Sequence, residues 1–245
     1  MKRILLILSI LLALPVSAQI RDVPGGASLT GFQPQELIAP GVLATFGLIT
    51  HYCAHETWDY GIRDGVLSSE RNFPSIENYF QYVPAALHLS LGAMGVSCRK
   101  GFWDRFIESA LAHSVCGLLT LPSKAIFSTL RPDGSNYRSF PSGHTSLTFT
   151  GAELVRMDYG PLWGAGAWGI GVAAASLRIY HNRHWFSDIL LGAAIGILSA
   201  RAGGWLLQPF KNLFGITTSG SKDMALLPVY DPYTRSLSFA FGLSF

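Results

Sequence analysis

The sequence predicts an all-α fold, an integral membrane bundle of about five to six helices with its functional site at the exported face. Charged residues make up 13% of the 245 residues, about half of the roughly 25% usual in soluble domains. Hydrophobic residues make up 49%, and the mean hydropathy is +0.31. Apolar runs rich in glycine and alanine recur without alternation, which indicates helices packed closely in lipid. A soluble all-α core is the alternative, because several runs are shorter than about 18 residues.

The N-terminus predicts export. Residues 1–18 combine two basic residues, Lys2 and Arg3, with an apolar run over residues 4–16 and small residues at 16–18. This pattern is typical of a cleaved signal peptide. An uncleaved membrane anchor is the alternative, although the run is shorter than the about 20 residues that a span needs. Residues 19–210 are then expected to form one membrane-embedded domain.

Six apolar runs follow the N-terminal segment, and each of them predicts a helix. They cover residues 40–50, 82–96, 106–122, 145–155, 161–177 and 189–207. The segment between the first two runs, residues 55–79, is polar with interspersed aromatic residues such as Trp58 and Phe73. That mixture indicates a surface or interfacial segment.

Basic residues indicate how the bundle is oriented. A connector over residues 99–105 carries three of them, and Arg156 and Lys211 fall on the same side if the last four or five runs all cross. Positive residues mark the cytoplasmic side, so the loops over residues 131–144 and 178–188 are expected to face the exported side. Cleavage of a signal peptide would leave the new N-terminus on the exported side. This fits the arrangement only if the first apolar run lies in the interface or bends back instead of crossing the membrane.

Residues 211–245 differ in composition from the bundle. After Lys211 the composition changes toward threonine, serine and glycine, and the ending SLSFAFGLSF alternates between polar and apolar residues. This alternation predicts a small strand or hairpin, with disorder as the alternative. The pattern indicates no function for the tail.

Composition also excludes two classes of protein. The net charge of +3 comes without any run of Lys and Arg that would follow a phosphate backbone, so nucleic acid is not an expected partner. The three cysteines, Cys53, Cys98 and Cys116, form no CxxC pair. They indicate buried apolar residues and neither a disulfide framework nor a zinc site.

Three polar clusters stand out in the loops assigned to the exported side. The first, KAIFSTLRP, places Lys124 and Arg131 seven residues apart. Seven residues are about two helical turns, so both cations are expected on one helix face, with Pro132 ending that helix.

The second cluster is PSGH, at residues 141–144. Ser142 is a natural helix N-cap, and Gly143 lets the backbone approach a ligand closely. The free backbone N–H groups at the start of such a helix form an anion site. His144 follows directly.

The third cluster is RIYHNRHWFSD, in which Arg178 precedes His184 by six residues and Asp188 follows it by four. On a helix His184 and Asp188 are neighbours. The carboxylate can accept a hydrogen bond from one ring nitrogen and leave the other nitrogen free.

Together the clusters supply three cations, backbone donors, two histidines and one carboxylate. Two arginines and a lysine can hold the oxygens of a tetrahedral oxyanion and neutralise the charge that spreads over them during transfer. Each element alone has an ordinary explanation: an interfacial cation, a helix cap, a structural histidine pair. Their joint occurrence favours a site that binds and attacks a phosphate group.

The three stretches resemble the signature of the type 2 phosphatidic acid phosphatase superfamily. That signature runs Lys, six residues, Arg-Pro; then Pro-Ser-Gly-His; then Ser-Arg, five residues, His, three residues, Asp. The match extends from Lys124 to Asp188. It departs at one position, where Leu177 replaces the expected serine and Ser176 stands one place earlier, which leaves a secondary contact open.

The resemblance implies a metal-independent phosphatase that needs no cofactor. It implies that His184 attacks phosphorus to form a phosphohistidine and that Asp188 orients its ring. It also implies that His144 protonates the leaving oxygen and then activates water. The phosphate-binding residues implied by the motifs are Lys124, Arg131, Ser142, Gly143 and Arg178.

Within that superfamily the membrane lipid phosphatase branch fits best, with a phosphorylated membrane lipid and the bilayer as partners. Only the eight residues DGSNYRSF separate Pro132 from Pro141, whereas soluble exported acid phosphatases of the family usually carry a longer insertion, and vanadium haloperoxidases are typically much longer chains. The resemblance implies a bacterial inner-membrane enzyme facing the periplasm and acting most naturally on lipid A. Undecaprenyl diphosphate and phosphatidylglycerol phosphate are the alternative substrates, and a non-catalytic anion-binding membrane protein is the alternative class. The oligomeric state is left open.

Residues beside the motifs have two interpretations. His181, Arg183 and Arg138 either touch a second phosphate or headgroup or are solvated loop residues. Asp133 and Asn136 are expected to shape the turn after Pro132. The remaining histidines, His51, His55, His88 and His113, are interpreted as interface or core residues.

Overall fold

The computed structural model describes residues 32–67, 74–217, 224–231 and 236–243. The segment predicted as a signal peptide, residues 1–18, lies outside the described residues. Within these ranges the chain forms ten helical segments: η1 (Pro34–Leu37), α2 (Ile38–Cys53), η2 (His55–Tyr60), α3 (Gly61–Leu67), α4 (Glu77–Phe80), α5 (Val83–Ser90), α6 (Phe102–Phe127), α7 (Gly143–Tyr159), α8 (Pro161–Tyr180) and α9 (Phe186–Phe214). Near the C-terminus, β1 (Met224–Asp231) and β2 (Ser236–Leu243) pair as an antiparallel hairpin.

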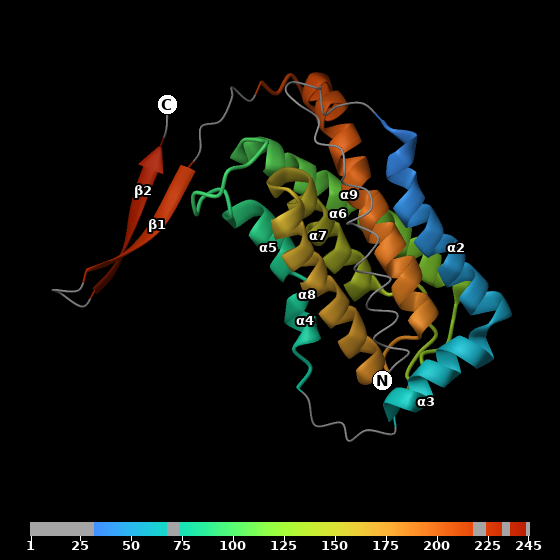
Figure 1. Cartoon of the computed structure of the whole chain (residues 1–245). Coiled ribbons are helices and arrows are strands. Elements are labelled where there is room, and N and C mark those ends of the chain that lie inside the picture. Colours follow the sequence, from blue (N-terminus) through green and yellow to red (C-terminus); the bar gives the residue numbers. More distant parts are fainter. Residues whose placement is uncertain (1–31, 68–73, 218–223, 232–235, 244–245) are drawn as a thin grey trace.

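Helices α7 and α9 form the centre of the bundle, and α2, α6 and α8 pack around them (Figure 1). Close approach of α7 and α9 depends on glycine. A Cβ atom at Gly196 of α9 would lie 2.5 Å from the carbonyl oxygen of Ser146, and one at Gly192 would lie 2.7 Å from that of Ser142. Any larger residue would therefore force the two helices apart, and with them the PSGH segment and the start of α9.

Among the described residues, three helical segments are long and apolar enough to cross a membrane: Pro34–Cys53, Phe102–Phe127 and Phe186–Phe214. The predicted helical bundle is confirmed with three candidate membrane spans, and α7 and α8, which contain the predicted runs over residues 145–155 and 161–177, are not among them. The sequence predicts one helix over residues 82–96, whereas α5 covers only Val83–Ser90.

The first apolar run differs from the expectation of an interfacial or re-entrant segment. Residues 40–50 belong to a helical segment of 20 residues, Pro34–Cys53, which has the length of a span. The extra length includes Glu36, whose carboxylate forms an ion pair with Arg201 and accepts a hydrogen bond from Trp205 Nε1 at 2.9 Å. Because Arg201 and Trp205 of α9 contact the Glu36 carboxylate, the helical segment begins at Pro34, six residues before the apolar run.

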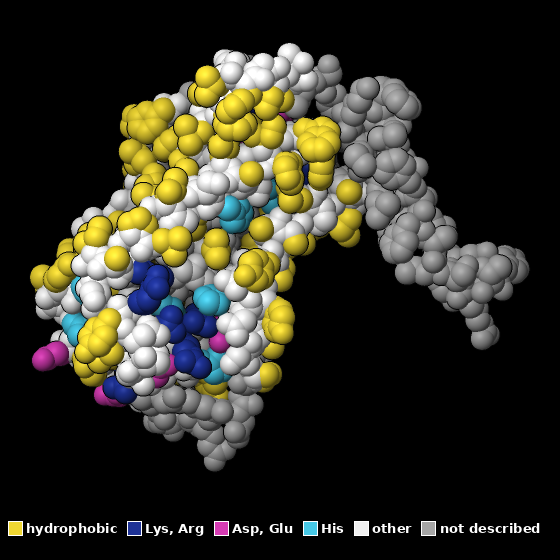
Figure 2. All heavy atoms as spheres, turned by 180° about the vertical axis from the view of Figure 1, so that it is seen from behind, with side chains coloured by type: hydrophobic (Ala, Val, Ile, Leu, Met, Phe, Trp, Pro, Cys, Tyr) yellow, Lys and Arg dark blue, Asp and Glu magenta, His cyan; other side chains and the backbone are white. Residues whose placement is uncertain are grey.

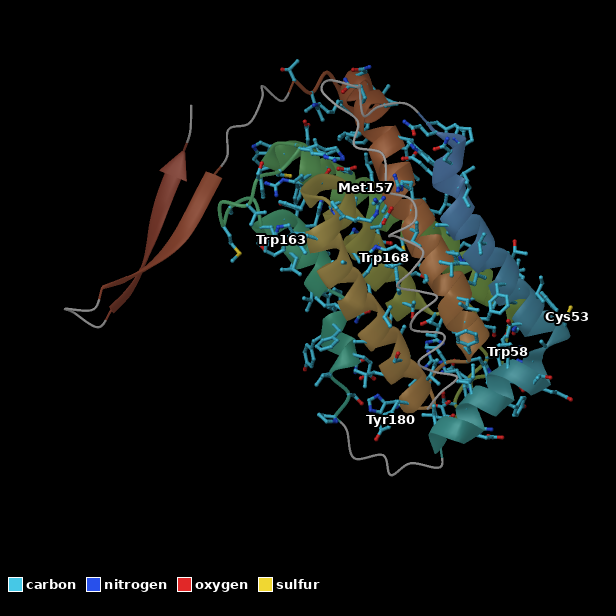
Figure 3. The ribbon with its side chains drawn as sticks, viewed as in Figure 1. Cys53, Trp58, Met157, Trp163, Trp168 and Tyr180 are labelled. Carbon is cyan, nitrogen blue, oxygen red and sulfur yellow. The ribbon has the colours of Figure 1, made fainter. Side chains whose placement is uncertain are left out.

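The same contacts show that α2 and α9 run antiparallel. Glu36, before α2, meets the C-terminal half of α9, whereas Gly47 lies against Leu190 and Leu191 near the start of α9. Figure 3 places Trp58 and Tyr180 toward one end of the bundle, and Met157 and Trp163 toward the other. The loops that carry the three motifs lie at the same end of the bundle as Trp58 and Tyr180. We call this end of the bundle the site end.

Candidate active site

Lys124 and Arg131 come from different structural elements. Lys124 lies in the last turn of α6, which ends at Phe127 with Ser128 in the left-handed conformation (φ 43°). Arg131 follows in the loop. The prediction that one helix presents both cations is wrong, because the left-handed residue stops the helix before Pro132 can.

Lys124 is tied to the loop that leads into the second motif. Its Nζ donates hydrogen bonds to the carbonyl oxygens of Pro141 at 2.6 Å and Arg138 at 2.9 Å. A Cβ atom at Gly143 would lie 3.7 Å from Lys124 Cε. The ammonium group therefore lies beside the PSGH segment, as a site that uses both motifs requires.

Ser142 caps helix α7, as the sequence predicts. The side chain is fully buried, its Oγ accepts a hydrogen bond from the hydroxyl group of Thr145 at 2.9 Å, and the Thr145 N–H lies 3.5 Å away. The backbone N–H of Ser142 donates to the carbonyl oxygen of Asp188 at 3.0 Å. This bond joins the second motif directly to the third.

His184 and Asp188 are in contact, with 3.1 Å between Nδ1 and Oδ2. His184 precedes α9, and Asp188 lies in the first turn of that helix, where Oδ2 also accepts the Trp185 N–H at 2.9 Å and the Ser139 hydroxyl. The predicted pair is present in the structure, but it arises because Asp188 caps the helix N-terminus, not from two residues on one helix face. When a carboxylate accepts a hydrogen bond from Nδ1–H of a neutral imidazole, Nε2 is the unprotonated ring nitrogen.

The surroundings keep His184 neutral. Its side chain is 2% exposed, and burial lowers its pKa well below the usual value for histidine. The positive charges of Arg178, Lys124 and Arg131 lower the pKa further. A neutral imidazole is the form that can act as a nucleophile.

Arg178, in the last turn of α8, meets two residues that the motifs do not include. Its Nη1 lies 3.5 Å from Glu77 Oε1 and 3.3 Å from Asn78 Oδ1, both on α4. The same Asn78 oxygen lies 3.2 Å from His144 Nε2. The sequence offered no signal for Glu77 or Asn78 beyond the polar character of residues 55–79.

Two arginines of the site have buried N–H groups that lack an acceptor among the described residues. Within the described part of the chain, Nε of Arg131 and Nε of Arg178 are buried and have no hydrogen-bond partner. Buried guanidinium donors are normally satisfied. An oxyanion between the arginines would supply the missing acceptors.

Two polar neighbours of the motifs form ion pairs with acidic side chains, one in the loop after Pro132 and one on α4. Arg183 lies 3.0 Å from Asp133, and His181 lies 3.0 Å from Glu77. The side chain of Asp133 also accepts the backbone N–H of Ser135 at 2.9 Å. Asp133 therefore shapes the predicted turn after Pro132.

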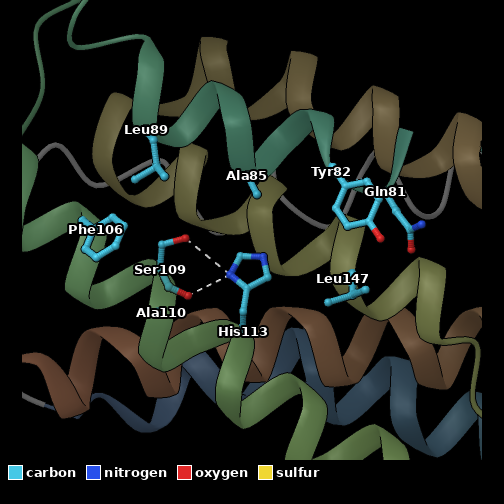
Figure 4. Close-up of a pocket in the computed structure, with 9 residues that line it drawn as sticks. All are labelled: Gln81, Tyr82, Ala85, Leu89, Phe106, Ser109, Ala110, His113 and Leu147. Atoms are coloured by element: carbon cyan, nitrogen blue, oxygen red, sulfur yellow. Dashed lines mark hydrogen bonds between the residues drawn. The ribbon is translucent and has the colours of Figure 1, made fainter. Parts of the chain in front are cut away.

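Figure 2 shows Lys, Arg and His side chains gathered in a hollow on one face of the molecule, with hydrophobic side chains above and beside them. An apolar cavity of about 260 Å³ lies between α5, α6 and α7 (Figure 4). Its wall includes Tyr82, Ala110, His113 and Leu147. Leu147 is three residues from His144 on α7, so the cavity begins about one helical turn from the charged site.

The helical fold places a buried histidine in the field of three cations, which is the chemistry expected of a site that binds an oxyanion. Residues 106–211 match the family model of the PAP2 superfamily. This part of the chain belongs to that superfamily, and the resemblance drawn from the three motifs is confirmed for it.

A protein of similar sequence and two solved structures of similar fold are also known. A lipid A 1-phosphatase of Porphyromonas gingivalis is 37% identical over 135 residues, which are 54% of this chain and 30% of that protein. The chain thus spans about a third of this relative's length. Among solved structures, a transmembrane PAP2 type phosphatidylglycerolphosphate phosphatase from Bacillus subtilis is 20% identical with a TM-score of 0.50, covering 71% of this chain and 96% of that one. The LpxE structure from Aquifex aeolicus is 21% identical with a TM-score of 0.47, covering 59% and 93%.

Proposed function

We propose that the protein is a membrane lipid phosphatase that hydrolyses a phosphate monoester through a phosphohistidine at His184. The observation that carries this proposal is the contact between two buried side chains, with 3.1 Å between His184 Nδ1 and Asp188 Oδ2. Membership of residues 106–211 in the PAP2 superfamily supports the same reaction class.

In the first step, Nε2 of His184 attacks phosphorus and the bond from phosphorus to the leaving oxygen breaks. His184 becomes positively charged as its new bond to phosphorus forms, and Asp188 stabilises that charge through Nδ1–H. Lys124, Arg131 and Arg178 bind the phosphoryl oxygens, together with the Ser142 hydroxyl and the Gly143 N–H. Fixed positive groups of this kind stabilise the charge on a transferring phosphoryl group.

In this proposal His144 transfers a proton in both steps. In the first step it donates a proton to the leaving oxygen, so the alcohol departs neutral. In the second step it takes a proton from water, and the hydroxide attacks the phosphohistidine to release phosphate and neutral His184. Asn78 holds the His144 ring, and Glu77 and Asn78 together hold Arg178, so α4 positions both the proton donor and one cation.

The substrate class follows from the surroundings of the site. The charged hollow is bordered by hydrophobic side chains, and the apolar cavity begins near Leu147, about one turn from His144. A phosphorylated lipid would place its phosphate in the charged hollow and a hydrocarbon chain in the apolar cavity. Lipid A is the preferred substrate on the similarity to a lipid A 1-phosphatase. Phosphatidylglycerol phosphate is an alternative monoester. Undecaprenyl diphosphate is a second alternative, in which the bond that breaks is a phosphoanhydride and the leaving group is undecaprenyl phosphate.

We place the enzyme in the inner membrane of a bacterial envelope, with the site end facing the periplasm. The basic connector over residues 99–105 begins α6 at the opposite end from the motif loops, which supports that orientation.

The test is phosphate release by the detergent-purified protein from lipid A, undecaprenyl diphosphate, phosphatidic acid and a soluble aryl phosphate. The proposal expects release from at least one lipid, faster than from the aryl phosphate. Release from the aryl phosphate alone would show a phosphatase that does not act on lipids. No release from any of these substrates would refute the proposed reaction.

A further inference from the structure

Two histidines and an aspartate follow one another at intervals of four residues where α2 ends. His51 lies in the last turn of α2, and His55 and Asp59 lie in η2, a π-helix. Single π-helical turns frequently mark functional positions. None of the three residues belongs to the phosphatase motifs.

The three side chains converge. One ligand atom from each lies within 4.8 Å of the other two. His55 Nδ1 is 2.6 Å from Asp59 Oδ2, so a proton lies between these atoms. Because zinc binds nitrogen and oxygen ligands at about 2 Å, its ligand atoms lie within about 4 Å of one another. Small side-chain rotations would bring the three atoms to that spacing.

Charge and hydrogen bonding also favour a cation. Asp59 is 1% exposed, and its contacts among the described residues are His55 and Ser187, neither of which carries a permanent positive charge. His51 Nδ1 is buried without a partner in the same part of the structure. A buried carboxylate and an unused imidazole nitrogen are both satisfied by one metal ion.

A second cluster, His88, Glu108 and Asp158, shows the contrast. Lys100 Nζ lies 2.5 Å from Glu108 and 3.0 Å from Asp158. An ammonium group already neutralises these carboxylates, so that cluster has no need of a metal ion. Within the described ranges, no Lys or Arg side chain forms a hydrogen bond or ion pair with the His51 cluster.

We propose that His51, His55 and Asp59 bind one divalent transition metal ion of the zinc class. Two imidazoles and one carboxylate are ligands that zinc accepts. On binding, the metal replaces the proton between His55 and Asp59, and that proton is released to solvent. This assignment is independent of the proposed phosphatase function.

The metal would join three parts of the site end. The His51 ring stacks on Phe140 with 4.2 Å between ring centroids, directly before the PSGH segment. Asp59 accepts the backbone N–H of Ser187 at 2.8 Å, beside Asp188. A metal held by His51 and Asp59 would therefore stabilise α2 against both catalytic loops without touching the substrate.

The test uses the full chain without a histidine tag, stripped with EDTA, dialysed and titrated with Zn²⁺ alone by calorimetry. The expected result is about one ion per chain, with proton release and a higher unfolding temperature. His51→Gln and His55→Gln should each weaken binding by at least about tenfold. His113→Gln, which changes a histidine outside the cluster, should bind as the parent does. Asp59→Asn is not used, because Asp59 also accepts hydrogen bonds from Ser187 in the first turn of α9.

Cobalt gives a second readout that does not depend on stability. Co²⁺ bound to the three residues should show visible absorption bands that disappear in His51→Gln and His55→Gln and persist in His113→Gln. Binding that is equal in the parent and both cluster variants would overturn the proposal, and so would the absence of Zn²⁺ binding by a folded parent protein.

Discussion

Asn78 Oδ1 lies 3.2 Å from His144 Nε2, and the same oxygen lies 3.3 Å from Arg178 Nη1. The His144 ring and the Arg178 guanidinium group thus meet at one oxygen atom. The proposed mechanism brings the same two groups to the leaving oxygen and a phosphoryl oxygen of the substrate. In the proposed mechanism, Asn78 therefore orients the His144 ring and the Arg178 guanidinium group before the substrate binds.

Replacement of Asn78 by aspartate should change the pH dependence of the reaction. A carboxylate beside His144 stabilises the protonated ring, which is the form that donates to the leaving oxygen. The alkaline limb of the kcat profile should move up by about one pH unit, and KM should rise because the carboxylate repels phosphate. Asn78→Ala should lower kcat without moving the limb. An unchanged profile in Asn78→Asp would show that Asn78 does not act on His144.

The acid limb of the profile should report His184. Because burial and three cations lower the pKa of His184, its neutral form persists below the usual histidine pKa of about 6.5. The competent form is lost only as the pH falls through that lowered pKa. The acid limb of kcat/KM should therefore lie below about 6.5.

Arg131→Gln tests the cause of that behaviour. Removal of a positive charge makes protonation of His184 easier, so its pKa rises and the acid limb should move to higher pH. The same variant should also lower kcat/KM, since a phosphate contact is lost. An acid limb that stays in place would mean that Arg131 does not act electrostatically on His184.

Much of the site is predictable from local sequence, because its parts are short and contiguous. The Ser142 cap depends on PSGH alone, and the His184–Asp188 contact depends on four residues of chain. Glu77 and Asn78 could not be predicted, since they reach Arg178 across about 100 residues of sequence through the packing of α4 on α8. Local sequence also does not predict the helical extension before α2, which depends on the Glu36–Arg201 ion pair, or the end of α6, which depends on the left-handed conformation of Ser128.

The cavity between α5 and α6 predicts a selective effect on lipid substrates. Ala110→Trp fills the cavity and should lower kcat/KM for a long-chain lipid by about tenfold, the effect of about 1.4 kcal/mol. Hydrolysis of a soluble aryl phosphate should change little. Leu118→Trp, at a position that is 73% exposed on the same helix, is the matched control. Equal loss on both substrates would indicate damage to the fold instead of loss of a chain-binding surface.

Glycine packing predicts a stability effect that is specific to one position. Gly196→Ala places a Cβ atom 2.5 Å from the Ser146 carbonyl oxygen and should destabilise the bundle by roughly 1–3 kcal/mol. Gly166→Ala, where no atom lies within 4 Å of the added Cβ, should be neutral or slightly stabilising. Unfolding temperatures of the two variants in one detergent provide the comparison. Equal temperatures would contradict the close approach of α7 and α9.

The central claim is that His184 carries the phosphoryl group, and the most direct measurement is to trap it. Protein quenched during turnover of a lipid substrate in EDTA should carry one phosphoryl group that is labile to acid and stable to base, located by mass spectrometry at His184. His184→Ala should lack it and lose about 10³-fold or more in rate, while Asp188→Asn should retain the site at lower occupancy. Turnover with the phosphate on another residue, or undiminished activity in His184→Ala, would contradict the account.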